Sequence, residues 1–302
     1  MSAEVLVKQP ATGYLAALWR ALQSFRLLRE SWVGMVGAAL VGFWLLVALF
    51  APVLAPFDPL ATLQPFATPG TEFAGNAQVS AGTFWLGTDH LGRDILSRII
   101  WGARTVLFYS VLATVVAYMV GITMGLAAGY YGGWIDEILS ALSAIILAFP
   151  VLVLYIVIIT TIGASGLNIV IAITFATGPL VMRIVRGLVL DLRHREYVAA
   201  AQTRGESAWR IMLVEILPNA RGPLIVDACL RLGYVIITIG VLGFLGLGLP
   251  PPNPDWGSMI NDTRAMAMAF PHMTIYPCIA ISSLILGFNL MADGLREISL
   301  RD

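Results

Sequence analysis

The stretch ILSALSAIILAFPVLVLYIVIITTIGASGLNIVIAITFATGPLVM, residues 138–182, contains no Asp, Glu, Lys or Arg. As one helix its 45 residues would be about 68 Å long, roughly twice the hydrocarbon core of a bilayer. The stretch must therefore fold back on itself, and GASGLN at residues 163–168 is the segment that favours a turn. Two membrane spans are predicted here, near residues 139–162 and 169–190.

The rest of the chain has the same character. Segments near residues 32–54, 105–131, 223–249 and 273–292 are also long and apolar. Hydrophobic residues make up 58% of the 302 residues and charged residues only 12%, whereas soluble domains carry about 25% charged residues. The mean hydropathy is +0.84. These values argue against a water-soluble enzyme and predict an all-α, polytopic membrane protein with six transmembrane helices.

The spans divide the chain into an N-terminal segment, residues 1–31, and a transmembrane domain, residues 32–302. Residues 12–30 place apolar side chains on one helical face, which predicts a helix lying on the membrane surface. Two long loops remain between the spans, at residues 55–104 and 191–221.

The distribution of Lys and Arg predicts the orientation. With the N-terminus inside, the cytoplasmic segments hold thirteen of the 18 basic residues and the outer loops hold four. The bias places both termini and the 191–221 loop in the cytoplasm, and the 55–104 loop outside. The 18 basic residues equal the 18 acidic ones in number, so nothing indicates a nucleic-acid partner.

The motifs of nucleotide-hydrolysing and proteolytic sites are missing or incomplete. The only lysine, Lys8, follows Val7, so the Gly-Lys step of a P-loop is absent. Ser165 lies in a Gly-x-Ser-Gly pattern that resembles the serine motif of six-span intramembrane proteases. No His lies in a predicted span to serve as its base, so an interhelical turn at Ser165 is favoured over a nucleophile.

No metal or cofactor site is predicted either. Asp89, His90 and Asp94 cluster in a polar loop, as such residues commonly do, and they do not define a complete ligand set. The two cysteines, Cys229 and Cys278, are too few for a disulfide scaffold or a four-cysteine zinc site. We therefore expect no catalytic, cofactor-binding or metal-binding residue in this chain.

The 191–221 loop carries the most informative pattern, REYVAAAQTRGESAWRIMLVEILPN at residues 195–219. Good helix formers before Gly205 predict a short helix, which Gly205 ends in a left-handed conformation. Ser207 can cap a second helix, which Pro218 ends. The alanines at 199–201 leave a surface narrow enough to enter a cleft of another protein.

This loop resembles the EAA motif of permease subunits in bacterial ABC importers. The motif reads Glu-Ala-Ala, three residues, Gly, nine residues, then Ile-x-Leu-Pro. The matching positions are Ala200, Ala201, Gly205, Leu217 and Pro218. Two positions depart from it, since Ala199 replaces the Glu of the motif and Glu215 replaces its Ile. Glu196, one turn earlier, is a candidate substitute for the missing Glu.

Further stretches are similar to the second, C-type permease of the dipeptide, oligopeptide and nickel group. They are EYV at 196–198, LGTDHLGRDILSR at 86–98, GYYGG at 129–133, GFLGLG at 243–248 with PPPNPDWG at 250–257, and FNLMADGLR at 288–296. The resemblance covers about two thirds of the chain continuously and implies the type I ABC importer permease fold.

The resemblance also implies partners and a location. This chain would form a pore with a homologous second permease in the bacterial cytoplasmic membrane. Two ABC ATPase subunits would bind ATP and Mg²⁺ and receive the 195–218 loop in a cleft. An extracytoplasmic solute-binding protein would deliver the substrate, which the sequence leaves open among dipeptides, oligopeptides, nickel chelates, glutathione and opines.

Three groups of residues are candidates for these roles. The expected ATPase-coupling loop residues are Glu196, Tyr197, Ala200, Ala201, Gly205, Trp209, Leu217 and Pro218. The expected outer-face loop residues are Asp89, Arg93, Asp94, Pro251 and Trp256, with Trp256 at the membrane boundary. Asp227 and Arg231 lie four residues apart in a predicted span and are a candidate intramembrane ion pair. The pair either lines the translocation path or locks its helix against a neighbour.

A secondary transporter is the alternative function. It would need inverted repeats and broken helices around a midplane site, and it would leave the EAA-like loop unexplained. Co-purification with an ATPase separates the two hypotheses.

Overall fold

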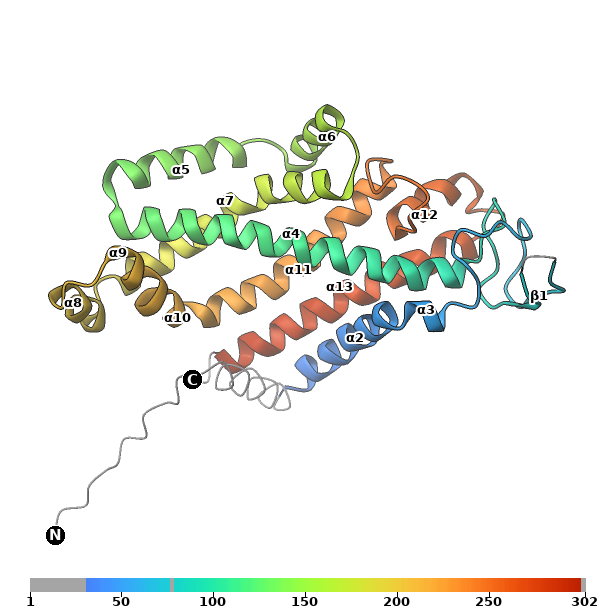
Figure 1. Cartoon of the computed structure of the whole chain (residues 1–302), viewed down its shortest axis with the longest axis horizontal. Helices are drawn as coiled ribbons and strands as arrows, with labels where there is room; N and C mark the ends of the chain where they lie inside the picture. The colour runs from blue at the N-terminus through green and yellow to red at the C-terminus, as the bar shows by residue number, and fades with distance from the viewer. Residues whose placement is uncertain (1–30, 77–78, 300–302) are drawn as a thin grey trace, which may run out of the picture.

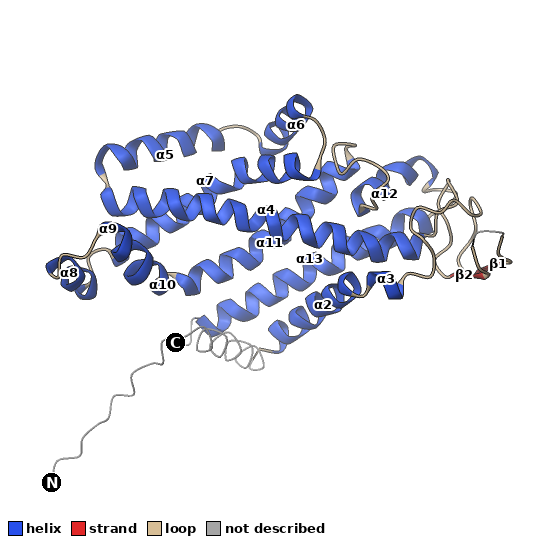
Figure 2. Cartoon of the chain, in the orientation of Figure 1, coloured by secondary structure: helices blue, strands red, loops and turns tan. Residues whose placement is uncertain are grey.

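The computed structural model describes residues 31–76 and 79–299, so the surface helix predicted for residues 12–30 lies outside the described residues. The described chain is helical almost throughout, with one short antiparallel pair of strands, β1 (Thr71–Phe73) and β2 (Gly82–Phe84). Figure 2 shows both strands at one end of an elongated helical bundle. The predicted all-α class is confirmed, and the small hairpin is an addition to it.

Among the described residues, five helices are long and apolar enough to cross a membrane. They are α2 (Trp32–Leu49), α4 (Ile95–Tyr131), α7 (Gly166–Leu192), α11 (Arg221–Phe244) and α13 (His272–Ser299). The helices α5 (Gly133–Leu147) and α6 (Val151–Ile162) meet at 90° and give a sixth span if they are counted as one broken span.

The remaining helices are short and lie between these spans. They are α3 (Ala51–Leu54), α8 (Glu196–Thr203), α9 (Ala208–Arg210), α10 (Leu217–Asn219) and α12 (Trp256–Thr263), with a π-helical segment at Ile211–Ile216 and a 3₁₀ turn at Arg264–Met266. Figure 1 shows α8, α9 and α10 at one end of the bundle and β1 at the opposite end. We call these the loop end and the hairpin end.

Helix α4 begins at Ile95 rather than at residue 105, so the long loop before it ends at Asp94. The Asp94 carboxylate caps the helix by accepting hydrogen bonds from the Ser97 backbone N–H at 2.8 Å and from its hydroxyl at 2.6 Å. Arg98 lies in the first turns of α4 but is buried by protein. A stretch without charges therefore marks the lipid-facing part of this helix and not its true start.

The residues of the span predicted at 139–162 form two helices that meet at 90° and not one continuous helix. Helix α5 ends at Leu147, α6 begins at Val151, and Pro150 occupies the position just before α6. Proline has no backbone N–H and disfavours the helical conformation of the residue before it. The helix therefore breaks at Pro150. The proline indicates this break, whereas the length and hydrophobicity of the segment do not.

The turn predicted at residues 163–168 is present. Helix α6 ends at Ile162 and is followed by Gly163, whose φ is +90°, and α7 begins at Gly166. The Ser165 hydroxyl accepts a hydrogen bond from the Asn168 backbone N–H at 3.2 Å and caps α7. Ser165 is thus the cap of a helix. This agrees with the prediction that Ser165 belongs to an interhelical turn and is not a catalytic nucleophile.

The contact between α4 and α7 is the most extensive in the bundle. Gly121, Gly125 and Gly129 of α4 face the valines at positions 181, 185 and 189 of α7, each series spaced by four residues. A Cβ atom at Gly125 would lie 2.6 Å from Val185 Cβ and 2.8 Å from the Met182 carbonyl oxygen. Glycine here lets the two backbones approach closely, as small residues do between membrane helices. This contact fixes α7, which leads directly into α8.

Trp256, expected at the membrane boundary, is instead fully buried at the start of α12. Its indole N–H donates to the Ile99 carbonyl at 3.0 Å, and its ring meets Trp44 of α2 edge-on at 5.0 Å between centroids. An indole with a satisfied N–H is as suited to a core as to an interface. Helix α11 ends at Phe244 rather than near residue 249, and Gly246 at φ +78° turns the chain towards α12.

Candidate functional site

The loop between α7 and α11 has the two-helix form predicted from its sequence. Gly205 has φ +73° and closes the end of α8, where its N–H donates to the Gln202 carbonyl at 2.9 Å. The Ser207 hydroxyl accepts from the Arg210 N–H at 3.4 Å and caps the second helix. That helix runs from α9 through a π-helical segment into α10, so Pro218 lies inside its last turn and does not end it.

One face of this loop packs onto the membrane domain. Val198 and Ala201 of α8, together with Ile211, Met212 and Ile216, are buried in a cluster that also contains Val189 of α7 and Leu126 of α4. Ala201 has a relative exposure of 0%. The prediction that Ala201 forms part of the exposed docking surface is therefore wrong, because its methyl group faces the buried side of α8.

The opposite face of the loop is exposed. It carries Glu196 and Ala200 on α8 and Trp209 and Pro218 on the second helix, while Tyr197 and Leu217 are half-buried. Trp209 has a relative exposure of 52%, and the neighbouring Leu213 and Val214 are exposed to a similar degree. The loop thus presents the small side chains of Ala199 and Ala200 beside a ridge of apolar ones, a surface suited to a complementary cleft.

Ion pairs, which the sequence pattern does not indicate, hold the two helices of the loop together. Arg204 pairs with Glu206 at 2.9 Å and with Glu215 at 3.7 Å, and Arg210 pairs with Glu206 at 3.1 Å. The Arg204 guanidinium holds the pKa of Glu206 below its usual range. Glu215, which departs from the EAA pattern, thus links the second helix back to the end of α8. Glu196 forms no ion pair with any other residue that the structure describes.

At the same end of the bundle, α7 is tied to the turn between α4 and α5. Arg186 forms an ion pair with Asp136 of α5, in which its Nη2 donates to Oδ2 at 2.6 Å. The Nη1 group of Arg193 donates to the Gly129 carbonyl at 3.0 Å. Since α8 begins three residues after Arg193, the loop is connected mechanically to the broken α5–α6 segment. The spacing of these residues in the sequence gives no signal of either contact.

The intramembrane ion pair predicted from spacing is formed. The Arg231 Nε donates to Asp227 Oδ2 at 2.7 Å, and the Tyr118 hydroxyl of α4 donates to the same oxygen. The pair therefore joins α11 to α4, as the helix-locking interpretation requires. Tyr118 lies 109 residues away in the sequence, and an isolated tyrosine in an apolar helix gives no indication of its partner.

Replacing Asp227 with Asn is expected to lower the stability of the protein by about 1–2 kcal/mol. Arg231 then loses its counter-charge, and Tyr118 donates to a weaker acceptor. Thermal unfolding of the purified protein in detergent measures the effect. The double variant with Asp227→Asn and Arg231→Gln should regain part of the loss, because no unpaired charge remains. If the single variants Asp227→Asn and Arg231→Gln each left thermal unfolding unchanged, the coupling of the two residues would be contradicted.

The residues expected in outer-face loops lie at the hairpin end, and most of them are structural. Asp89 is buried, where it accepts from the N–H groups of Leu91 and Arg93 at 2.9 Å and from Arg93 Nε at 2.7 Å. Asp94 is also buried as the cap of α4, and burial raises its pKa. Of the five residues, Pro251 alone is exposed.

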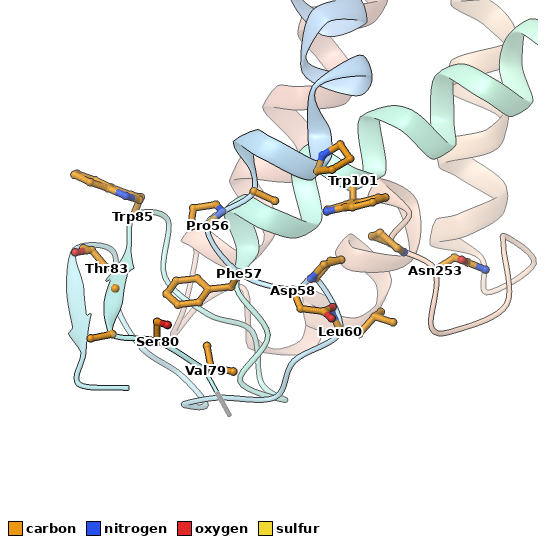
Figure 3. A pocket seen from close by; sticks show the side chains of 16 residues that line it. Pro56, Phe57, Asp58, Leu60, Val79, Ser80, Thr83, Trp85, Trp101 and Asn253 are labelled. Atoms are coloured by element: carbon orange, nitrogen blue, oxygen red, sulfur yellow. The ribbon is translucent and has the colours of Figure 1, made fainter. Parts of the chain in front are cut away.

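A wide pocket of about 970 Å³ opens at the hairpin end between α3, the start of α4 and the hairpin. Figure 3 shows Phe57, Trp85 and Trp101 in its walls, with Asp58 close to the chain that leaves α3. Asp58 is the one charged residue among the described residues that line it. Its mainly apolar character was not predicted, because the walls come from three separate loops.

Comparison with known proteins agrees with this geometry. Residues 121–301 match the family described as "Binding-protein-dependent transport system inner membrane component", and residues 18–69 match "N-terminal TM domain of oligopeptide transport permease C". The chain is 39% identical to the dipeptide transport system permease protein DppC of Alkalihalophilus pseudofirmus, over 92% of this chain and 88% of that protein. It is 36% identical to the glutathione transport system permease protein GsiD of Pectobacterium atrosepticum, over 90% of this chain and 87% of that one.

A solved structure supports the fold. The MetNI methionine ABC transporter in an inward-facing conformation matches with a TM-score of 0.53 at 16% identity, over 69% of this chain and 98% of the matched chain. The type I importer permease fold expected from the sequence is thereby confirmed. The chain belongs to the family of binding-protein-dependent transport system inner membrane components and is a permease subunit of an ABC importer.

Proposed function

We propose that this permease subunit imports dipeptides, oligopeptides or a chemically similar small solute. The observation that carries the substrate class is the similarity to dipeptide, di/tripeptide and glutathione permeases at 36–39% identity over at least nine tenths of this chain. Glutathione is itself a tripeptide, so these relatives share a substrate chemistry of short, flexible molecules with terminal charges.

The chain works with partners in this proposal. A second permease completes the pore, two ATPase subunits bind and hydrolyse ATP with Mg²⁺, and a solute-binding protein delivers the substrate. The ATPases are placed at the loop end, where Ala200 and Trp209 face outward from α8 and α9. The binding protein is placed at the hairpin end, where the pocket beside Trp85 opens.

The contacts at the loop end suggest how ATP binding reaches the pore. When the ATPases close, they move α8 and the second loop helix as one unit, since the Arg204–Glu206–Arg210 ion pairs hold the two together. The motion passes to α7 through the buried cluster around Ala201, and from α7 to α5 through the Arg186–Asp136 pair. This chain contributes the transmission of force, and its partners contribute the chemistry.

The orientation places both termini and α8–α10 in the cytoplasm and the hairpin outside. Single cysteines at Glu72 and Gln202, both exposed, test it in a background without Cys229 and Cys278. A membrane-impermeant maleimide applied to intact spheroplasts is expected to label position 72, and position 202 only after permeabilisation. Labelling in the reverse order would contradict the orientation.

Reconstitution of the complete transporter tests the function. Membrane vesicles that contain both permeases, the ATPases and the binding protein should accumulate a labelled dipeptide when ATP is supplied on the ATPase side. Uptake driven by an ion gradient in the absence of ATPase subunits would instead favour a secondary transporter. Transport of a solute without peptide character would overturn the substrate class and leave the family assignment intact.

A further inference from the structure

A smaller cavity of about 220 Å³ lies at the hairpin end, where α4, the end of α11 and α12 meet. Arg93 and Arg98 line one side of it. Ser258 and Asn261 of α12 supply neutral hydrogen-bonding groups, and Asp262 also lies in the wall. The cavity is separate from the wide pocket beside Trp85, although Asn253 borders both.

Arg98 is the unusual member of this set. Its side chain is only 2% exposed, and its Nε has no hydrogen-bond partner among the described residues. Its Nη1 donates to the Pro59 carbonyl at 3.4 Å, and the nearest carboxylate oxygen, on Asp89, is 3.9 Å from Nε. Buried polar groups in proteins nearly always have a partner. Arg98 is thus a buried guanidinium on the wall of a cavity, and the described residues do not satisfy all of its N–H groups.

The acidic residues nearby are occupied elsewhere. Asp89 accepts three hydrogen bonds from Leu91 and Arg93. Asp255 is fully buried and caps α12 by accepting from the N–H groups of Gly257 and Ser258, at 3.4 and 3.2 Å. Burial raises the pKa of Asp255 to about 6, so its carboxylate is still mostly ionised at neutral pH, and both of its oxygens already accept backbone hydrogen bonds. These carboxylates leave the free N–H of Arg98 without a partner.

Arg93 adds a second guanidinium to the same cavity. Its Nε is held by Asp89, and its Nη2 lies 3.5 Å from Asp262 Oδ2. Asp262 has a side-chain exposure of 38% and lies nearer to solvent than either arginine. The cavity is thus lined by two largely buried cationic groups and one more exposed anionic group. Such an arrangement fits the carboxylate of a molecule that also carries a positive charge.

We propose that this cavity is a carboxylate-binding subsite of the permease, which receives the C-terminal carboxylate of a peptide after its release from the binding protein. Arg98 and Arg93 hold the carboxylate, and the side-chain amide of Asn261 donates to it. Asp262 faces the cationic part of the same molecule. Ser258 only lines the wall, because its hydroxyl already donates to the Asp255 carbonyl at 2.8 Å. The volume admits the terminal residue and not a long chain. The inference rests on the proposed transport of peptides, which always end in such a group unless they are modified.

Binding to the assembled transporter without its binding protein tests the subsite. The complex of two permeases and two ATPases is placed in lipid nanodiscs and probed by saturation-transfer NMR with alanyl-alanine, alanyl-alanine amide and acetate. We expect alanyl-alanine to bind at least tenfold more tightly than the amide or acetate. Arg98→Gln should abolish the preference for the free carboxylate, and Arg98→Lys should retain part of it.

Two further variants keep the result interpretable. Arg104→Gln is the matched control, because Arg104 lies on the same helix, stacks over Trp101 at 5.7 Å and does not line the cavity. Asn261→Leu fills the cavity without touching a buried charge and should weaken binding of alanyl-alanine, even if Arg98→Gln does not assemble. Equal binding of acid and amide, or of acetate and alanyl-alanine, would overturn the proposal.

Different results would contradict the proposed subsite and the proposed transport function. If the complete wild-type transporter with its binding protein imports no peptide, the proposed function is wrong. If it imports alanyl-alanine but Asn261→Leu and Arg98→Gln leave the preference for the free carboxylate unchanged, only the subsite is wrong.

Discussion

Replacing Gly205 with Val is expected to reduce substrate transport by about tenfold or more, which corresponds to roughly 1.4 kcal/mol or more in the coupling step. Gly205 has φ +73°, in the left-handed region that a β-branched side chain resists strongly. A Cβ atom at Gly205 would meet no described atom within 4 Å. The effect is therefore conformational, and it acts on the angle between α8 and the second loop helix.

The matched control at this position is Gly205→Asn. Asn has a side chain of similar size to Val but tolerates the left-handed conformation, so transport should stay within about twofold of the wild type. Each variant complex is purified, and its ATPase content and binding-protein-stimulated ATP hydrolysis are measured beside transport. Normal coupling in Gly205→Val would show that this loop does not transmit the ATPase motion.

Ala200 and Ala201 separate the docking surface from the loop's own core. Ala200 is exposed on α8, while Ala201 is buried against the membrane domain. Ala200→Trp should leave the protein stable and obstruct ATPase binding. Ala201→Trp should lower the stability of the permease itself by about 1–3 kcal/mol, as overpacked cores do. Thermal unfolding of the permease without ATPases distinguishes the two, and equal melting of both variants would contradict the assignment of faces.

The sequence was sufficient for features that depend on local chemistry. A stretch without charges identifies apolar segments, and Gly205 with Ser207 identifies a helix end and a helix start. The four-residue spacing of Asp227 and Arg231 identifies an ion pair. Each of these depends on residues that are neighbours along one helix or one turn, so the chain between them fixes their geometry.

Features that depend on which face of a helix is covered were not predictable in this way. Ala200 and Ala201 are adjacent and chemically identical, and only the packing of α8 against the π-helical segment of the second loop helix and the buried cluster around it decides which one is buried. Trp256 is an equally good interface or core residue until Trp44 and Ile99 are placed around it. Arg98 looks like a charge at the outer edge of a span, and only the fold places it on the wall of a cavity.

The break at Pro150 is an intermediate case. Proline disfavours helix at the residue before it, so the signal was in the sequence. It was outweighed by the continuous hydrophobicity of residues 139–162, which fixes the length of an apolar segment and not its path. The exposed side chains of α5, α6 and the link between them, among them Leu142, Phe149 and Val153, are consistent with a surface completed by the second permease.

Replacing Gly125 with Ala is expected to destabilise the permease by about 1–3 kcal/mol, although only one methyl group is added. The new Cβ would lie 2.6 Å from Val185 Cβ and 2.8 Å from the Met182 carbonyl oxygen. The carbonyl belongs to the backbone of α7 and cannot rotate away, so the two helices must separate. Gly121 and Gly129 make the same contact one turn to either side. A local separation of α4 and α7 at Gly125 therefore strains all three glycine–valine contacts.

Gly187→Ala is the control that isolates this effect, because it makes the identical chemical change on the partner helix of the same pair. A Cβ at Gly187 would meet no described atom within 4 Å. Replacing Gly with Ala in an open helical position should raise stability by up to about 1 kcal/mol. The two variants should thus shift the thermal unfolding midpoint in opposite directions. Since α7 continues into α8, Gly125→Ala should also weaken coupling to the ATPases in the fraction that still assembles. A Gly125→Ala variant as stable as Gly187→Ala would mean that α4 and α7 are not packed backbone to backbone, and the path from the loop to the pore would need another helix.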